Sequence, residues 1–226
     1  MTAKVHPNVA APSPGLGQQP AVAPGDGEPA AVTLTVWRKS LLFNCRGFTV
    51  FDARGDLVYR VDSYASDSRA EVVLMDAAGR PVLTVRRRCR KLIGLVGLGL
   101  SSDQWLLYRG VDEARRLPPL YAMKRAAAQS QHMRGGAKSV AHVAACSAGA
   151  GYEVEGSYLR RRCTVYEYDG RRRAVAEVRP SPKEAVGSDV FRLVVRPGME
   201  VSLAMAVVLA LDQMFGKPSL LRSWSS

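Results

Sequence analysis

A run of apolar residues near the C-terminus places the strongest constraint on how this chain can fold. Residues 199–215, MEVSLAMAVVLALDQMF, are typical of a helix, but between Val201 and Leu211 only Ser202 is polar. A surface helix shows a polar stripe at the helical period, and this segment has none. The helix therefore enters a membrane or is enclosed by the rest of the protein. Crossing a bilayer takes roughly 20 apolar residues, and Asp212 would need a partner in hydrocarbon, so we predict a buried helix.

Three turn motifs predict that the rest of the chain is a series of β-hairpins. Apolar and β-branched runs flank residues 52–55 (DARG) and residues 76–79 (DAAG), and a third pair of runs meets at Asp169-Gly170. In such turns the aspartate side chain bonds the backbone two residues on, and the glycine adopts the left-handed conformation. Together with other short alternating segments, these hairpins give about a dozen strands before the one helix.

This number of strands predicts how the helix is enclosed. A dozen strands exceed the usual open sheet of four to six, and closure into a barrel removes the exposed edges. A barrel of this width is too wide to be filled by its own side chains. We therefore predict a mainly β fold, a closed antiparallel β-barrel of about twelve strands around a central hydrophobic C-terminal helix.

Composition separates the folded part from two tails. Residues 1–30 are rich in Pro, Ala and Gly, without aromatic residues or apolar periodicity, and are predicted to be a disordered tail. The barrel domain is predicted over residues 31–217, followed by a short tail, residues 218–226. The first segment matches neither a signal peptide nor a transit peptide, and the cysteines form no C-x-x-C pair. We expect an intracellular, cytoplasmic protein that is not secreted. A peripheral position at a membrane and a nuclear location are the alternatives left open.

Basic residues give the chain a formal net charge of +12. A strongly basic domain attracts polyanions such as nucleic acid or anionic lipid head groups. Alternate residues of a strand share a face, so Arg86 should lie on the same side as Arg88, and Arg160 on the same side as Arg162. We identify these four arginines as a candidate lipid-binding site. The alternative is that the arginines are dispersed and only solubilise the protein.

Motifs for catalysis or metal binding are missing from the sequence. It contains no H-x-x-x-H pair, acidic calcium loop, P-loop or G-x-S-x-G motif. We therefore expect a binding module that is not an enzyme and holds no cofactor or metal. Nucleic acid is a partner that the charge allows, although known DNA- and RNA-binding motifs are missing and the aromatic content is only 7%.

Several blocks of the sequence, taken together, resemble the plant LURP-one-related family. These blocks are residues 34–44 (LTVWRKSLLFN), 47–64, 71–88, 104–110 (QWLLYRG) and 209–215 (LALDQMF). The resemblance implies a fold like that of tubby C-terminal domains and phospholipid scramblases, a barrel of about twelve strands around a hydrophobic helix. It also implies a plant protein, with some relatives linked to basal defence against pathogens. Residues 89–100 are richer in glycine than the family pattern, and residues 126–150 have the composition of an insertion.

The combined observations predict a regulatory or membrane-tethering module. Its expected partners are anionic membrane lipids, including phosphoinositides, which tubby domains bind through basic side chains. No tubby lipid-binding position can be matched to a residue of this chain, and the chain is expected to be a monomer. Two alternatives remain open, a nucleic-acid-associated regulatory protein and a lipid scramblase. A scramblase would need a route through the membrane, which the short terminal helix does not supply.

Overall fold

The structure, a computed structural model, describes residues 30–42, 46–63, 70–90, 102–111, 117–126, 138–147, 149–169, 171–182 and 189–216. The two predicted tails lie outside these ranges, except for Ala30. Residues 127–137 and most of the glycine-rich segment 94–103 also lie outside the described ranges. Within the predicted insertion, residues 126–150, the structure shows that Ser139–Ala145 is a strand of the domain.

The described residues form twelve strands and, after them, one long helix. In chain order they are β1 (Val32–Trp37), β2 (Arg46–Phe51), β3 (Leu57–Ser63), β4 (Glu71–Asp76), β5 (Pro81–Arg90), β6 (Ser102–Arg109), β7 (Tyr121–Arg125), β8 (Ser139–Ala145), β9 (Tyr152–Ser157), β10 (Arg162–Glu167), β11 (Ala174–Pro180), β12 (Val190–Val195) and α2 (Val201–Phe215).

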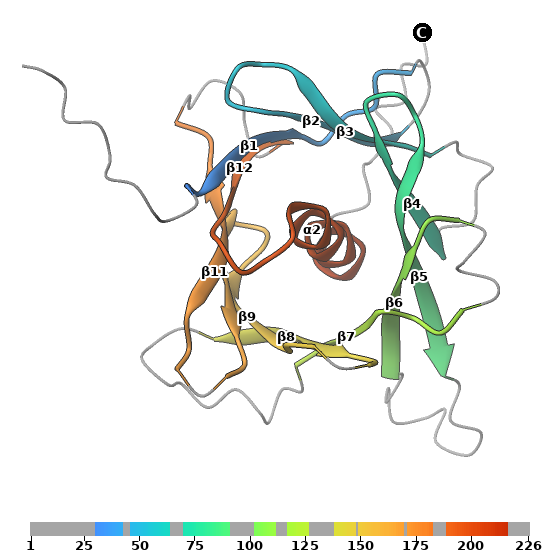
Figure 1. Cartoon of the computed structure of the whole chain (residues 1–226), viewed down its shortest axis with the longest axis vertical. Coiled ribbons are helices and arrows are strands. Elements are labelled where there is room, and N and C mark those ends of the chain that lie inside the picture. Colours follow the sequence, from blue (N-terminus) through green and yellow to red (C-terminus); the bar gives the residue numbers. More distant parts are fainter. Residues whose placement is uncertain are drawn as a thin grey trace, which may run out of the picture.

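The strands close into a barrel in which each strand pairs with its neighbours in the sequence (Figure 1). The closing pair joins β1 to β12 along the whole of β1, from Val32 opposite Val195 to Trp37 opposite Val190. Every pairing between neighbouring strands is antiparallel. The predicted closed antiparallel barrel is therefore confirmed.

The hairpin turns use the chemistry that their sequences predict. The side chain of Asp52 accepts the backbone N–H groups of Arg54 and Asp56, both at 2.9 Å, and Gly55 has a φ of +91°. The side chain of Asp76 likewise accepts the N–H of Arg80 at 2.9 Å. These bonds are local, so the conformation of each turn is determined by residues of the turn itself.

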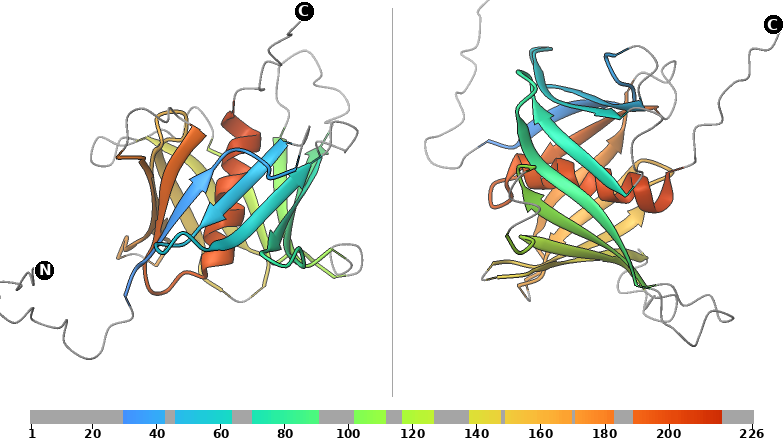
Figure 2. Two further views of the ribbon diagram at one scale, coloured as in Figure 1. Left: turned by 90° about the horizontal axis from the view of Figure 1, so that it is seen from above. Right: turned by 90° about the vertical axis from the view of Figure 1, so that its right-hand side faces the viewer.

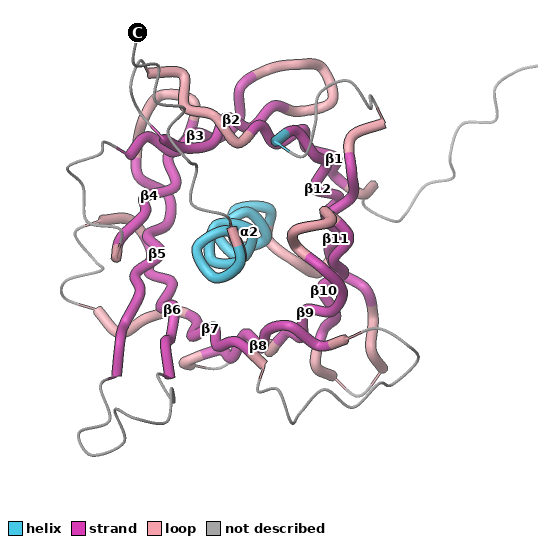
Figure 3. The backbone as a smooth tube through the Cα atoms, turned by 180° about the vertical axis from the view of Figure 1, so that it is seen from behind, coloured by secondary structure: helices cyan, strands magenta, loops and turns pink. Residues whose placement is uncertain are grey.

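Helix α2 runs through the centre of the barrel and has wall strands on all sides (Figures 1 and 3). The side chains predicted to lie inside, Leu203, Val207, Leu209 and Leu211, are each at most 5% exposed. They belong to one core cluster with the inward-facing residues of the strands. The helix, which has no polar face, therefore packs against apolar side chains on every side. Its predicted burial is confirmed.

Strand direction determines which end of the barrel each loop occupies. Because all pairs are antiparallel, the odd-numbered strands finish at the end where β1 finishes, and the even-numbered strands finish at the other. Helix α2 follows β12, so it enters at the second end and finishes at the first (Figure 2). The segment after β1, the β9–β10 turn and the last turn of α2 therefore share one end of the barrel.

Candidate functional site

The last turn of α2 is tied to the barrel wall by polar contacts. The carboxylate oxygen Oδ1 of Asp212 lies 2.9 Å from Nε of Arg38 and accepts the hydroxyl of Tyr158 at 3.1 Å. The indole N–H of Trp105 donates to the side chain of Gln213 at 2.8 Å. Arg125 donates to a carbonyl of the same turn. Four wall residues thus fix the end of the helix, and two of them, Arg38 and Arg125, supply the positive charge that a helix C-terminus favours.

A buried arginine supports the same end of the barrel from the β9–β10 turn. Arg161 is only 7% exposed, and its guanidinium lies 4.3 Å from the ring centres of both Tyr158 and Phe191. Burial, reinforced by the Asp212 carboxylate, raises the pKa of Tyr158, so its hydroxyl stays protonated and can donate. This packing gives the turn a fixed conformation above the helix end.

The same end of the barrel carries several exposed cations, and we call five of them the basic end. It consists of Lys39 after β1, Arg88 on β5, Lys138 before β8, Arg160 in the β9–β10 turn and Arg162 at the start of β10. All five are exposed, and none makes an ion pair with another residue of the described ranges. Their charges therefore face solvent without a neutralising carboxylate.

Arginines with acidic partners occur at both ends of the barrel, and at the end where α2 finishes they include Arg38, Arg86, Arg87 and Arg179. The opposite end differs because few of its described arginines are unpaired. In the hairpin turns, Arg54 pairs with Asp52 and Asp56, and Arg80 with Asp76. Further ion pairs join Arg173 to Glu167 and Arg196 to Glu177. Of the described arginines at this end, only Arg109 and Arg171 are exposed without an ion pair. The positive charge is therefore concentrated at the end where α2 finishes.

The structure places the four predicted arginines at different points of the wall. Arg88, Arg160 and Arg162 are exposed members of the basic end. Arg86 faces outward, but Nε and Nη2 both lie 2.8 Å from a carboxylate oxygen of Glu71. Strands β6 to β9 separate β5 from β10, which puts the two pairs roughly 24 Å apart along the wall. The four share one end of the barrel but not one cluster.

The β9–β10 segment also differs from the strand alternation used to predict it. Residues 158–161 form a turn, in which the N–H of Arg161 bonds the carbonyl of Tyr158 at 3.0 Å. Arg161 takes a left-handed φ of +54°, and its side chain packs inward while Arg160 remains exposed. Arg160 and Arg162 are both accessible because of this turn, not because they lie on one strand face.

Sequence reasoning missed two further arginines beside Arg162. Cys163 pairs with Val178, so the preceding residue, Arg162, lies next to Arg179, which pairs in turn with Arg192. Like charges on adjacent strands repel. The ion pair of Arg179 with Glu177 relieves part of this repulsion, whereas exposed Arg192 has no ion pair with a described residue. The alternation of apolar and basic residues within VRP (178–180) and FRLVV (191–195) indicates that Arg179 and Arg192 face outward. Only the strand register shows that they lie side by side.

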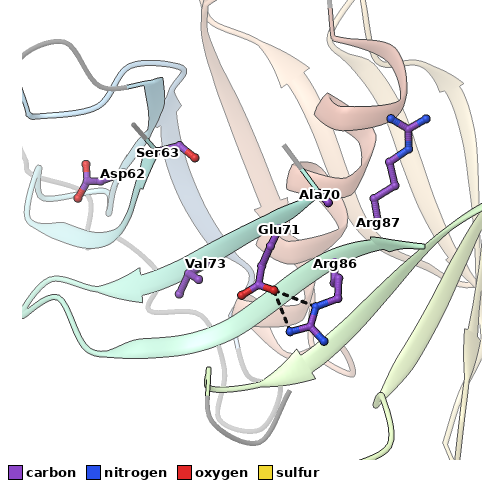
Figure 4. Close-up of a pocket in the computed structure, with 7 residues that line it drawn as sticks. All are labelled: Asp62, Ser63, Ala70, Glu71, Val73, Arg86 and Arg87. Atoms are coloured by element: carbon purple, nitrogen blue, oxygen red, sulfur yellow. Dashed lines mark hydrogen bonds and ion pairs between the residues drawn. The ribbon is translucent and has the colours of Figure 1, made fainter. Parts of the chain in front are cut away.

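A pocket opens in the wall where β3 and β4 separate. These strands pair only at Tyr59–Asp76 and Arg60–Met75. The pocket beyond is lined by Asp62, Ser63, Ala70, Glu71, Val73, Arg86 and Arg87 (Figure 4). Arg86 and Glu71 point toward each other across the strand pair, and Arg87 pairs with Asp103 and lies over the ring of Trp105. Because carboxylates compensate both arginines, the pocket attracts anions less than the basic end does.

Within the described ranges, no group of three or more His, Cys, Asp or Glu side chains is placed to hold a metal ion. No helix in that part of the chain has the length and apolar character needed to cross a membrane.

Comparison with known proteins identifies relatives over most of the chain. The family model described as LURP-one-related matches residues 32–212. Protein LURP-one-related 8 of Arabidopsis thaliana is 42% identical over 192 residues, covering 82% of this chain and 88% of its own. Protein LURP-one-related 17 of the same plant is 37% identical and covers 86% and 88%. An Arabidopsis thaliana protein of known X-ray structure, 23% identical, matches with a TM-score of 0.55 over 83% of this chain and 93% of its own, which supports the fold.

Proposed function

This chain belongs to the LURP-one-related family, and we propose that it is a non-enzymatic membrane-tethering module that binds anionic phospholipids through the basic end. The observation that carries the proposal is the difference between the two ends of the barrel. Five exposed cations at the basic end lack acidic partners among the described residues, whereas at the opposite end only two described arginines, Arg109 and Arg171, do. Near an anionic leaflet each Lys or Arg contributes on the order of 1 kcal/mol, so five are enough for peripheral binding.

The arrangement of the cations favours a lipid surface over one head group. The basic end draws its cations from β5, from the start of β8 and from the β9–β10 turn, which lie around the rim of the barrel. A single phosphate would contact only one of these positions, whereas a flat leaflet presents anions to all of them. Phosphoinositides fit the same proposal as more highly charged members of such a surface.

A role in plant defence follows from the family resemblance and belongs to the same proposal. In this proposal, a defence signal controls the recruitment of the protein to the cytoplasmic face of a membrane. The cytoplasmic leaflet is the anionic one, which agrees with the intracellular location expected from the sequence.

Co-sedimentation with vesicles of phosphatidylserine and phosphatidylcholine tests the proposal. The variant Arg88→Gln/Arg160→Gln/Arg162→Gln removes three charges from the basic end. The matched control Arg54→Gln/Arg80→Gln/Arg171→Gln removes three charges from turns at the opposite end. The first variant should lose most of the binding and the control should keep it, and wild-type binding should fall as salt rises.

Two outcomes would contradict the proposal. Equal losses in the two variants would mean that net charge alone attracts the protein to the vesicles. Failure of the wild-type chain to bind at low salt would remove lipid as the partner. A gel shift with duplex DNA is run on the same proteins, and retention on DNA without binding to vesicles would favour the nucleic-acid alternative.

A further inference from the structure

The basic end also exposes large apolar side chains next to its cations. Trp37, Leu41 and Leu42 lie at the end of β1 and in the segment after it, and Leu159 lies in the β9–β10 turn. Leu41 and Leu159 are 54% and 53% exposed. Each exposed stretch contains a cation, Lys39 in the first and Arg160 in the second. Exposed leucines flanked by cations are the composition that interfacial membrane-binding segments use.

Contacts with the barrel hold both stretches in place. Arg38 in the first and Tyr158 in the second bind the same oxygen of Asp212, so the two stretches meet over the end of α2. In the first, buried Ser40 donates to the carboxylate of Asp62 and accepts the N–H of Leu42 at 3.0 Å. In the second, the turn rests on buried Arg161. The exposed leucines are therefore displayed by fixed turns, which lowers the entropy lost on binding.

We infer that Leu41, Leu42 and Leu159 insert into the boundary between the head groups and the acyl chains of an anionic bilayer. This inference rests on the proposed lipid binding and names the apolar contacts that accompany it. Lys39, Arg160 and Arg162 contact the head groups, and the cation–π contact between Lys39 and Trp37, 5.3 Å from the ring centre, places an aromatic ring at the interface. The cations beside these leucines favour a bilayer as the binding partner, because its anionic head groups lie directly above an apolar acyl layer.

Apolar residues at the opposite end provide the comparison. Val32 and Leu117 are 42% and 55% exposed. They lie at the start of β1 and in the β6–β7 connection, both at the end where most of the described arginines are paired. Exposure alone therefore does not distinguish the two ends of the barrel.

The test compares the full chain with the variants Leu41→Ser/Leu159→Ser and Val32→Ser/Leu117→Ser. Co-sedimentation with vesicles of phosphatidylserine and phosphatidylcholine measures affinity, and the pressure rise of a lipid monolayer at constant area measures insertion. The first variant should bind vesicles at least about tenfold more weakly, given the transfer energy of a leucine side chain. It should keep the wild-type salt dependence and lose most of the pressure rise. The control should match wild type in both assays.

Each other outcome overturns the inference in a distinct way. Wild-type binding without a pressure rise, or an unchanged Leu41→Ser/Leu159→Ser variant, leaves the charge contact standing but removes the insertion. No binding by the wild type removes the proposed function together with the insertion. Self-association of the wild type by analytical ultracentrifugation, lost in this variant while vesicle binding is unchanged, would assign the apolar face to a second copy of the chain.

Discussion

The guanidinium of Arg38 lies 2.9 Å from the carboxylate of Asp212 and joins the end of β1 to the last turn of α2. These residues are far apart in the sequence, and their side chains are only 24% and 16% exposed. The same oxygen of Asp212 accepts the hydroxyl of Tyr158. One carboxylate thus connects the helix to two separate parts of the wall, and it is the partner of both segments that display the leucines of the basic end.

Replacement of Asp212 should destabilise the barrel in a graded way. Asp212→Ala leaves the Arg38 guanidinium and the buried Tyr158 hydroxyl without this acceptor, which should lower the free energy of unfolding by about 3 kcal/mol. Asp212→Asn keeps an acceptor oxygen and should lower it by only about 1 kcal/mol. Urea denaturation measures both. Equal effects of the two substitutions would show that the contacts to Asp212 contribute little.

A charge at the centre of α2 should prevent folding. Val207 is 1% exposed and is enclosed by the wall, so Val207→Asp buries a carboxyl group at a cost of several kcal/mol. A domain of this size has roughly 5–15 kcal/mol of stability, and the variant should be largely insoluble. Val32→Asp, at a position 42% exposed, is the control and should remain soluble. A soluble Val207→Asp protein with the wild-type melting temperature would contradict the central position of the helix.

Much of the fold could be predicted because its signals are local. The turn residues Asp52, Gly55 and Asp76 take the geometry expected from their type alone. Because α2 is apolar on all sides, it must be enclosed, whichever parts of the sequence supply the enclosing strands. The closing pair β1–β12 has no local signal of its own, but it follows once a dozen strands must surround a helix.

The site was harder to predict because its chemistry depends on strand register. Sequence alternation put Arg86 on one face of its strand together with Arg88, but the ion pair with Glu71 arises only from the pairing of β4 with β5. The run of three arginines after Leu159 gave no sign that the middle one is buried. Arg161 is buried because Phe191, on β12, comes to lie beside Tyr158. Pairings between distant strands carry this information, and no single stretch of sequence contains it.

Gly156 should tolerate no side chain because backbone occupies the space. It has a φ of +106°, and a Cβ atom there would lie 2.2 Å from the carbonyl oxygen of Arg162. Gly156→Ala should therefore cost several kcal/mol, since the strain is combined with an overlap that only backbone movement relieves. Gly55→Ala is the matched control, with a φ of +91° and open space around the added atom, and should cost about 1 kcal/mol. Thermal denaturation distinguishes the two, and similar losses would contradict the close approach at Gly156.

Alkaline conditions should destabilise the barrel because buried acids remain protonated in the folded state. Burial raises the pKa of Cys163 from 9.0 to about 12 and that of Tyr152 from 10.0 to about 12. Above pH 9 the unfolded chain loses the thiol proton while the folded chain keeps it, so the unfolded state binds fewer protons. The free energy of unfolding must then fall as pH rises. The contribution of these two groups to the free energy of unfolding is fully present below pH 9 and is lost progressively as the pH rises toward 12.

The variant Cys163→Ala isolates one of these groups. Between pH 9 and 10 the thiol should account for a loss of at most about 1.4 kcal/mol per pH unit, and the variant should lack that early part of the decline. It begins from a lower stability because a buried side chain is shortened, so the slope with pH is the quantity compared. Cys146→Ala, which removes an exposed thiol, should change the slope far less. Denaturant titrations at several pH values give the slopes, and a Cys163→Ala slope equal to wild type between pH 9 and 10 would mean that the thiol ionises as easily in the folded chain as in the unfolded one.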